Sequence, residues 1–281
     1  MAETFPAFLI NLDRDVERAT LFDQRAKAVA LHYERVSGFD PAISQLPDGI
    51  VARGCNYTKG AIGCAMSHRA LWRRSVEAAS PMLVFEDDAH LRADFRAMFP
   101  SVMEQIASPW DIVLLGFNTD ELLTARIDGA IGAYMHFAPR YPSPANIRNF
   151  VEGRDRVCPL PLLAAFGTCG YAISPAGARK LLARCFPMDH RSLPIAGLPE
   201  RRTATSIDAM MISAYPSIAA YVCFPPWRCL RILLHCRTHG RTKLSEQRLY
   251  DRLCPPSTEI TCPVTQLAAS LARNSATLAT S

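Results

Sequence analysis

The sequence predicts an α/β fold in which a mostly parallel central sheet is flanked by helices. Short apolar segments typical of buried strands alternate along the chain with longer amphipathic segments of helical periodicity. With 281 residues, of which 49% are hydrophobic and 20% charged, the chain is long enough to bury a core without disulfides. These features exclude a disordered chain, a coiled coil and a small disulfide-stabilised scaffold.

The first half of the chain predicts strands and helices in regular succession. Each expected strand is a short apolar run, and most are followed by a segment with the charge spacing of a surface helix. We expect strands at 8–12, 32–36, 82–88 and 111–115, helices at 14–30, 61–78 and 94–106, and a loop at 37–59.

In the second half, glycines and prolines recur through 119–160, and we expect this segment to be irregular. A strand at 169–174 leads to Pro175 in the first turn of a helix at 176–185. A helix at 205–214 and a strand at 219–224 follow, and the Ala-, Ser- and Thr-rich tail from Pro255 is expected to be poorly ordered.

The excess positive charge is concentrated near the C-terminus. The formal net charge is +5, and segment 225–254 carries seven basic residues against Glu246 and Asp251. Such a segment would face an anionic partner, such as nucleotide phosphates, nucleic acid or a membrane surface. Because no aromatic RNA-binding motif accompanies it, we expect no nucleic-acid partner.

The cysteines and the first residues bear on the cellular compartment. No basic, apolar signal peptide opens the sequence, and no apolar run approaches the roughly 20 residues that cross a bilayer. We therefore expect a cytoplasmic protein whose ten cysteines are reduced thiols. The absence of any Cys-x-x-Cys pair argues against a zinc ribbon and a thioredoxin-type redox site.

Three consecutive carboxylates, Glu86, Asp87 and Asp88, follow the apolar strand MLVF. In open α/β sheets ligands bind beyond the carboxyl ends of strands, which is where these residues are expected. Because close carboxylates repel one another, a cation is expected among them, and oxygen ligands suit Mg²⁺ or Mn²⁺. The alternative is a solvated turn before a helix.

The segment GCAMSHRALW (63–72) would place Cys64 and His68 on one face of a helix. A Cys–His nucleophile pair is conceivable. We prefer Cys64 as a small buried residue, with Ser67 and His68 hydrogen-bonding a neighbouring loop or a ligand.

Two further segments carry candidate site residues. In FGTCGYAISP (166–175), the glycines either punctuate a strand and helix or let the backbone at 167–170 line a pocket. Asp208 stands alone among apolar residues and either caps a helix or serves a polar site as a general base. Near the C-terminus, His235 or His239 is a candidate ligand of a cation, although surface exposure would explain both.

Taken together and in this order, the segments FLINLDRDVER (8–18), GCAMSHRALW (63–72), VFEDDA (84–89) and GTCGYAISPAGARKLL (167–182) resemble glycosyltransferase family 25. This is the lipopolysaccharide-biosynthesis and collagen-galactosyltransferase group. WDIVLLG (110–116), SIDAMM (206–211) and FPPW (224–227) occur in the expected order, so the resemblance covers about residues 5–230.

The resemblance assigns roles to individual residues. The triplet Glu86-Asp87-Asp88 would stand for the DxD-type acidic motif, with Asp88 as a metal ligand and Glu86 facing the donor ribose or a second ligand position. Asp208 would be the catalytic base near the acceptor. The region after FPPW departs from the family pattern, so the expectation that His239 is a further metal ligand rests on its residue type and not on the resemblance. Asn11, Asp13, Arg14 and Arg18 would lie near the uridine, and Asp87 would belong to the same donor site. The other expected donor-site residues, which the motif readings above supply, are His68, Gly167 and Thr168.

The resemblance also implies a GT-A-like fold and an inverting transfer of a hexose, usually galactose, from a UDP-sugar with Mn²⁺ or Mg²⁺. The expected partners are UDP-galactose or another UDP-hexose and a hydroxyl of a lipid-linked glycan such as a lipopolysaccharide or lipooligosaccharide core. One domain would span 1–254, and its basic segment would contact the anionic inner face of a membrane. The alternative is a catalytically inactive member that binds glycans or nucleotides as a scaffold.

Overall fold

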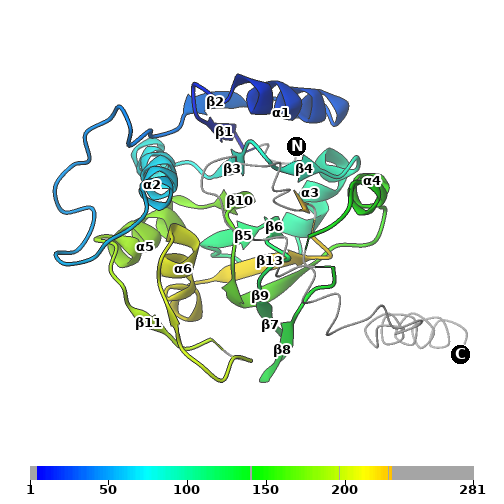
Figure 1. Cartoon of the computed structure of the whole chain (residues 1–281). Coiled ribbons are helices and arrows are strands. Elements are labelled where there is room, and N and C mark those ends of the chain that lie inside the picture. The colour runs from blue at the N-terminus through cyan, green and yellow to red at the C-terminus, as the bar shows by residue number, and fades with distance from the viewer. Residues whose placement is uncertain (1–4, 140, 196, 227, 230–281) are drawn as a thin grey trace, which may run out of the picture. The chain divides into compact units, whose positions relative to one another are not determined.

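A computed structural model describes residues 5–139, 141–195, 197–226 and 228–229 (Figure 1). The chain divides into two units after Ile232, and all described residues lie in the first unit, Met1–Ile232. The expectations for His239, for most of the basic segment and for the tail from Pro255 lie outside the described residues. The assignment of 1–254 to one domain therefore stays a prediction.

A nine-stranded mixed sheet forms the centre of the first unit (Figure 1). Its strands are β1 (Ala7–Asn11), β2 (Glu34–Ser37), β3 (Met82–Glu86), β5 (Ile112–Leu114), β7 (Leu123–Asp128), β8 (Ile131–Met135), β9 (Cys158–Ala165), β10 (Gly170–Ile173) and β13 (Ala220–Phe224). Their order is β2-β1-β3-β10-β5-β13-β9-β7-β8. Six of the nine, all except β10, β9 and β8, run in one direction, which confirms the α/β class.

Helices cover both faces of this sheet and create two separate cores. The helices are α1 (Val16–Ala28), α2 (Lys59–Ala78), α3 (Phe95–Met103), α4 (Pro144–Glu152), α5 (Pro175–Cys185) and α6 (Ile207–Ile212), with a 3₁₀ turn at Tyr215–Ser217. Phe8 and Val84 face the core under α2, α5 and α6, whereas Leu9 and Phe85 face the core under α1 and α3. Successive strand residues thus point to opposite faces, and both faces are buried.

The prediction that 119–160 is irregular is wrong, because β7, β8, α4 and the start of β9 lie there. The helix-breaking residues occupy positions that suit them. Gly129 makes the turn between β7 and β8 with a positive φ of 40°, and Pro144 follows the capping residue Ser143 at the start of α4. Pro159 and Pro161 lie in the part of β9 that pairs only with β13, where one missing N–H is tolerated.

Strand register brings the candidate site together. Ile10 at the end of β1 pairs with Glu86 at the end of β3, and Gly170 at the start of β10 pairs with Phe85. The ends of two parallel strands therefore meet the connection that enters β10. Two small sheets complete the unit, one of β4 (His90–Leu91), β14 (Arg228–Cys229) and β6 (Gly116–Phe117), the other of β11 (Ser192–Leu193) and β12 (Arg202–Thr203).

Candidate functional site

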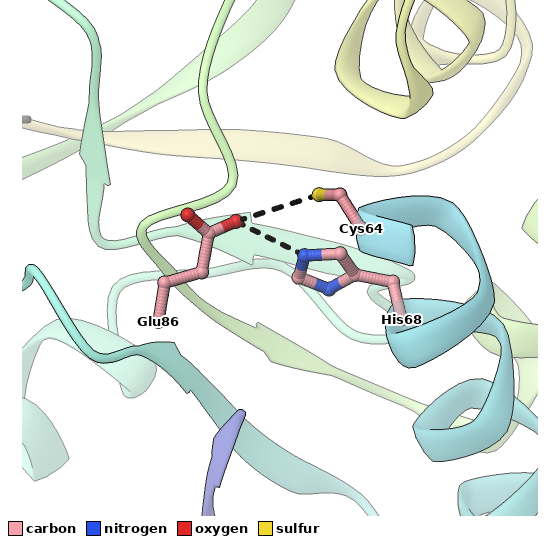
Figure 2. A group of neighbouring side chains, drawn as sticks. All are labelled: Cys64, His68 and Glu86. Carbon is pink, nitrogen blue, oxygen red and sulfur yellow. Dashed lines mark hydrogen bonds and ion pairs between the residues drawn. The ribbon is translucent and has the colours of Figure 1, made fainter. Parts of the chain in front are cut away.

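Helix α2 supplies two polar side chains to the end of β3. The helix begins after Thr58, whose hydroxyl accepts a hydrogen bond from the backbone N–H of Ala61 at 3.1 Å. Cys64 and His68 follow four residues apart on the face turned toward the sheet, as the helical spacing predicts (Figure 2). His68 is 1% exposed, so its ring nitrogens must find partners inside the protein.

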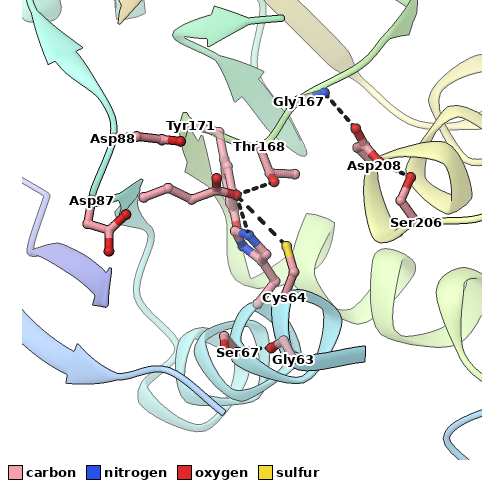
Figure 3. Close-up of polar contacts among 12 residues, drawn as sticks. Gly63, Cys64, Ser67, Asp87, Asp88, Gly167, Thr168, Tyr171, Ser206 and Asp208 are labelled. Atoms are coloured by element: carbon pink, nitrogen blue, oxygen red, sulfur yellow. Dashed lines mark hydrogen bonds and ion pairs between the residues drawn. The ribbon is translucent and has the colours of Figure 1, made fainter. Parts of the chain in front are cut away.

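The carboxylate of Glu86 collects these side chains around one oxygen. Its Oε1 lies 3.1 Å from His68 Nε2 and 4.0 Å from Cys64 Sγ, and it accepts a hydrogen bond from the Thr168 hydroxyl (Figures 2 and 3). The backbone N–H of Glu86 donates to Cys169 O at 3.1 Å. The contacts with Thr168 and Cys169 hold Glu86 against the connection between β9 and β10.

The second ring nitrogen of His68 reaches the buried phenol of Tyr171 on β10. His68 Nδ1 lies 2.8 Å from the Tyr171 hydroxyl, which also accepts a hydrogen bond from Trp72 Nε1 at 2.8 Å. Tyr171 is fully buried, and burial raises the pKa of its phenol well above the usual value. The phenol therefore keeps its proton.

Asp87 lies among different partners. Asn11 Nδ2 donates to Asp87 Oδ2 at 2.7 Å, and the Arg18 guanidinium forms an ion pair with the other carboxylate oxygen. Burial raises the pKa of Asp87, whereas the hydrogen bond from Asn11 and the charge of Arg18 act in the opposite direction.

Arg18 also links Asp87 to Asp88, because its Nη2 lies 3.4 Å from Asp88 Oδ2. A second α1 cation, Arg25, donates to the backbone oxygen of Ala89 at 3.1 Å. The acidic triplet thus has arginines on its α1 side. This arrangement lowers the electrostatic cost of three adjacent carboxylates.

Asp208 at the start of α6 accepts a hydrogen bond from the backbone of the connection between β9 and β10. Its Oδ2 accepts from Gly167 N at 2.8 Å, and its Oδ1 accepts from the Ser206 hydroxyl and from Ala209 N (Figure 3). Gly167 has a φ of +96°, and an added Cβ would lie 2.9 Å from the backbone nitrogen of Asn118. Only glycine fits this position without strain.

Two of the residues predicted for the donor site lie away from Glu86. Asp13 has a 69% exposed side chain, and hydrogen bonds from Arg35 and Ser37 lower its pKa. Arg14 forms an ion pair with Asp40 in the loop after β2. These two residues therefore link the segment after β1 to β2 and to the loop that follows it.

The comparisons with known proteins agree with this geometry. Residues 5–192 match the family model described as Glycosyltransferase family 25 (LPS biosynthesis protein), and this range contains both strand ends and α2. The chain belongs to glycosyltransferase family 25.

Individual relatives within family 25 carry two kinds of name. A bovine protein named "Probable inactive glycosyltransferase 25 family member 3" is 32% identical over 158 residues, which is 50% of this chain and 21% of the relative. Its human counterpart, named inactive, is 32% identical over 155 residues, again 50% and 21%. Mouse procollagen galactosyltransferase 2 is 26% identical over 193 residues, 62% of this chain and 27% of the relative. The matches thus span between about a fifth and a little over a quarter of these relatives.

The structure brings most of the predicted donor-site residues of this family 25 member to one edge. Glu86 contacts His68 and Thr168, and Asp87 contacts Asn11 and Arg18. The prediction for Ser67 is confirmed, since its hydroxyl accepts from Phe39 N in the neighbouring loop at 2.8 Å. No helix among the described residues has both the length and the apolar character that a membrane span requires.

Two contacts at this edge were missed by sequence reasoning. Tyr171 and Arg35 both lie on strands, and the sequence analysis gave neither of them a role in the site. Arg35 Nε donates to Asn11 Oδ1 at 2.9 Å and so orients the amide that holds Asp87. Strand alternation was the available signal. Arg35 on β2 pairs with Leu9 on β1, and Asn11 lies two residues further along β1 and therefore on the same face of the sheet.

At this edge of the sheet, two sets of described side chains have the chemistry to hold a metal ion. Cys64, His68 and Glu86 offer a sulfur, a nitrogen and an oxygen, all within 4.8 Å of one another. Such a mixed donor set suits Zn²⁺ better than Mn²⁺. The carboxylates of Asp87 and Asp88 offer only oxygens, which suit Mg²⁺ or Mn²⁺.

Proposed function

We propose that this family 25 member is an active, inverting glycosyltransferase. It moves a hexose, galactose in the first instance, from a UDP-sugar to a hydroxyl of a glycan acceptor such as a lipopolysaccharide or lipooligosaccharide core. The observation that carries the proposal is the meeting of Asn11, Arg18, His68, the acidic triplet and Thr168 at the ends of β1 and β3. This is the edge at which open α/β sheets bind their ligands.

The donor would bind along this edge. Arg18 has a 48% exposed side chain and is the cation that can turn from the carboxylates toward a diphosphate. Glu86 would accept a hydrogen bond from a donor hydroxyl, held in place by Thr168 and His68. Asn11 and Arg35 would keep Asp87 oriented beneath them.

A divalent cation, Mn²⁺ or Mg²⁺, would be held through Asp88. Its oxygen ligands fit such an ion, and the adjacent Asp87 adds negative charge. When bound, the cation would neutralise charge that develops on the departing diphosphate. The protein's own arginines would contribute to the same stabilisation.

Asp208 would be the general base for the acceptor hydroxyl. Its carboxylate is held by Gly167 N and Ser206, which fixes its direction at the start of α6. Removing the hydroxyl proton would let the acceptor oxygen attack the anomeric carbon opposite the leaving group, and one displacement inverts the configuration. We further propose a cytoplasmic protein whose basic segment 225–254 contacts an anionic membrane carrying a lipid-linked acceptor.

The decisive experiment is a calorimetric titration of the full chain with UDP, with Mn²⁺ and then with excess EDTA. Micromolar binding that requires the metal supports the donor site and the role of Asp88. UDP binding that is equally strong in Mn²⁺ and in EDTA would support the nucleotide site but would contradict the role of Asp88 as a metal ligand. A subsequent screen of UDP-hexoses for hydrolysis and for transfer to core oligosaccharides would identify the donor.

A second candidate function is supported by the relatives named inactive, which match half of this chain. An inactive member would act as a scaffold that binds nucleotides or glycans. It would bind UDP or a glycan without turning over any UDP-hexose. Absence of turnover in the screen, together with unchanged UDP binding, would favour the scaffold.

A further inference from the structure

The hydrogen bonds of Tyr171 determine where the proton of His68 lies. The indole N–H of Trp72 can only donate, so at that contact the Tyr171 oxygen is the acceptor. The phenol proton of Tyr171 then needs an acceptor of its own, because the residue is fully buried. Among the described residues the remaining hydrogen-bond contact of this hydroxyl is His68 Nδ1 at 2.8 Å.

If Tyr171 donates to Nδ1, a neutral His68 carries its proton on Nε2. That nitrogen lies 3.1 Å from Glu86 Oε1, a carboxylate oxygen that accepts. Every donor in the row Trp72, Tyr171, His68 then points toward an acceptor, and the row ends on Glu86. The opposite tautomer leaves the buried phenol proton without an acceptor and turns a bare nitrogen toward a carboxylate, and both defects are unfavourable.

We propose that Trp72 and Tyr171 are positioning residues that fix His68 as a neutral Nε2–H donor to Glu86. The Cys64–His68–Glu86 group is accordingly a hydrogen-bonded clamp on Glu86 rather than a metal centre. A metal at this group would need Nε2 without its proton, which Tyr171 opposes. The consequence for catalysis rests on the proposed role of Glu86 in donor binding, whereas the tautomer does not.

The tautomer can be read directly, without any substrate. In ¹⁵N-histidine-labelled protein, long-range ¹H–¹⁵N correlations distinguish a protonated Nε2 from a protonated Nδ1. We expect one of the seven histidines to show a fixed Nε2–H form whose Nδ1 resonance carries the shift of an accepted hydrogen bond, and this shift should be lost in Tyr171→Phe. A His68 ring that is protonated on Nδ1, or whose Nδ1 resonance is unchanged in Tyr171→Phe, would overturn the proposal.

Tyr215 provides a matched control. It is also a fully buried tyrosine, but its hydroxyl has no hydrogen-bond partner among the described residues. Tyr215→Phe removes the same atom and should leave the histidine spectrum and the affinity for UDP unchanged. Tyr171→Phe should weaken UDP binding about tenfold, the factor that corresponds to one hydrogen bond, with retained folding checked by circular dichroism.

Cobalt(II) tests the metal alternative. A thiolate bound to Co²⁺ gives a near-ultraviolet charge-transfer band, and we expect the titration of Cys64→Ser to match that of Cys158→Ser, whose cysteine is exposed. A band lost only in Cys64→Ser would show a metal centre and overturn the clamp. If UDP fails to bind the wild type, the function proposed above fails, but the spectrum and the cobalt titration still decide the tautomer.

Discussion

Glu86 and Asp87 are consecutive carboxylates at the end of β3, yet they lie in opposite environments. Glu86 points to the face covered by α2 and meets the neutral donors His68 and Thr168. Asp87 points to the face covered by α1 and meets Arg18 and the amide of Asn11. The alternation of side chains along a strand is the cause.

Because their environments differ, the partner of Asp87 can be replaced by a ligand, whereas the partners of Glu86 stay in place. Arg18 is half-exposed, so under the proposed function it can turn toward a diphosphate at low cost while a metal ion takes its place beside the carboxylates. His68 and Thr168 beside Glu86 are buried, and His68 is hydrogen-bonded to the buried Tyr171, so these partners cannot be exchanged without loss. We therefore expect cation chemistry on the Asp87–Asp88 side and fixed recognition on the Glu86 side.

The largest effect is expected for Asp88→Asn, which tests whether the α1 side holds a cation. It removes a candidate cation ligand and a charge that repels Asp87, so UDP affinity in Mn²⁺ should fall about a hundredfold or more while stability is unchanged or higher. Calorimetry and thermal unfolding measure the two effects. Asp128→Asn, an exposed carboxylate of β7, should change neither. Near-normal turnover of Asp88→Asn would contradict a metal site on the α1 side.

Asp87→Ala should cost about 2 kcal/mol of unfolding free energy, because the buried Asn11 amide and Arg18 lose their acceptor. The half-exposed Arg18 regains water, which keeps the loss below that of a fully buried pair. Urea denaturation measures it. Asp13→Ala removes another arginine-paired carboxylate from the same edge, and since that side chain is exposed we expect a much smaller loss than in Asp87→Ala. Equal losses in the two variants would contradict the asymmetry.

Thr168→Val tests the neutral side with an isosteric change. It removes the hydroxyl that donates to Glu86 and should lower the free energy of unfolding by about 1 kcal/mol. The binding free energy of UDP should weaken by a similar amount. Thr168→Ser keeps the hydroxyl and should retain affinity. If valine and serine behaved alike, the hydroxyl would not be what holds Glu86.

Sequence reasoning recovered the parts of this edge that depend on local pattern. The strand before the acidic triplet and the shared face of Cys64 and His68 follow from periodicities of 2 and 3.6 residues, and the structure has both. The structured segment 119–160 was missed because Gly and Pro signal breaks without saying which elements lie between them.

The contacts that define the site could not be read in this way. Thr168 and Glu86 are 82 residues apart, and their meeting depends on the antiparallel entry of β10 next to β3. Nothing in the local sequence around Tyr171 shows that its hydroxyl meets Trp72 and His68. Such contacts follow from strand order, which one sequence does not specify.

The last and smallest effect is on pH dependence, where Asp87 and Asp13 should differ in sign. Burial raises the folded-state pKa of Asp87 above 3.8, so its contribution to stability is greatest below 3.8 and is lost as pH rises through the raised pKa. Hydrogen bonds from Arg35 and Ser37 lower the pKa of Asp13, so its contribution is present above 3.8 and is lost as pH falls through the lowered value. Unfolding of Asp87→Asn and Asp13→Asn between pH 3 and 6, each compared with wild type, measures both slopes. Two differences of the same sign would show that the hydrogen bond from Asn11 and the charge of Arg18, and not burial, dominate the pKa of Asp87.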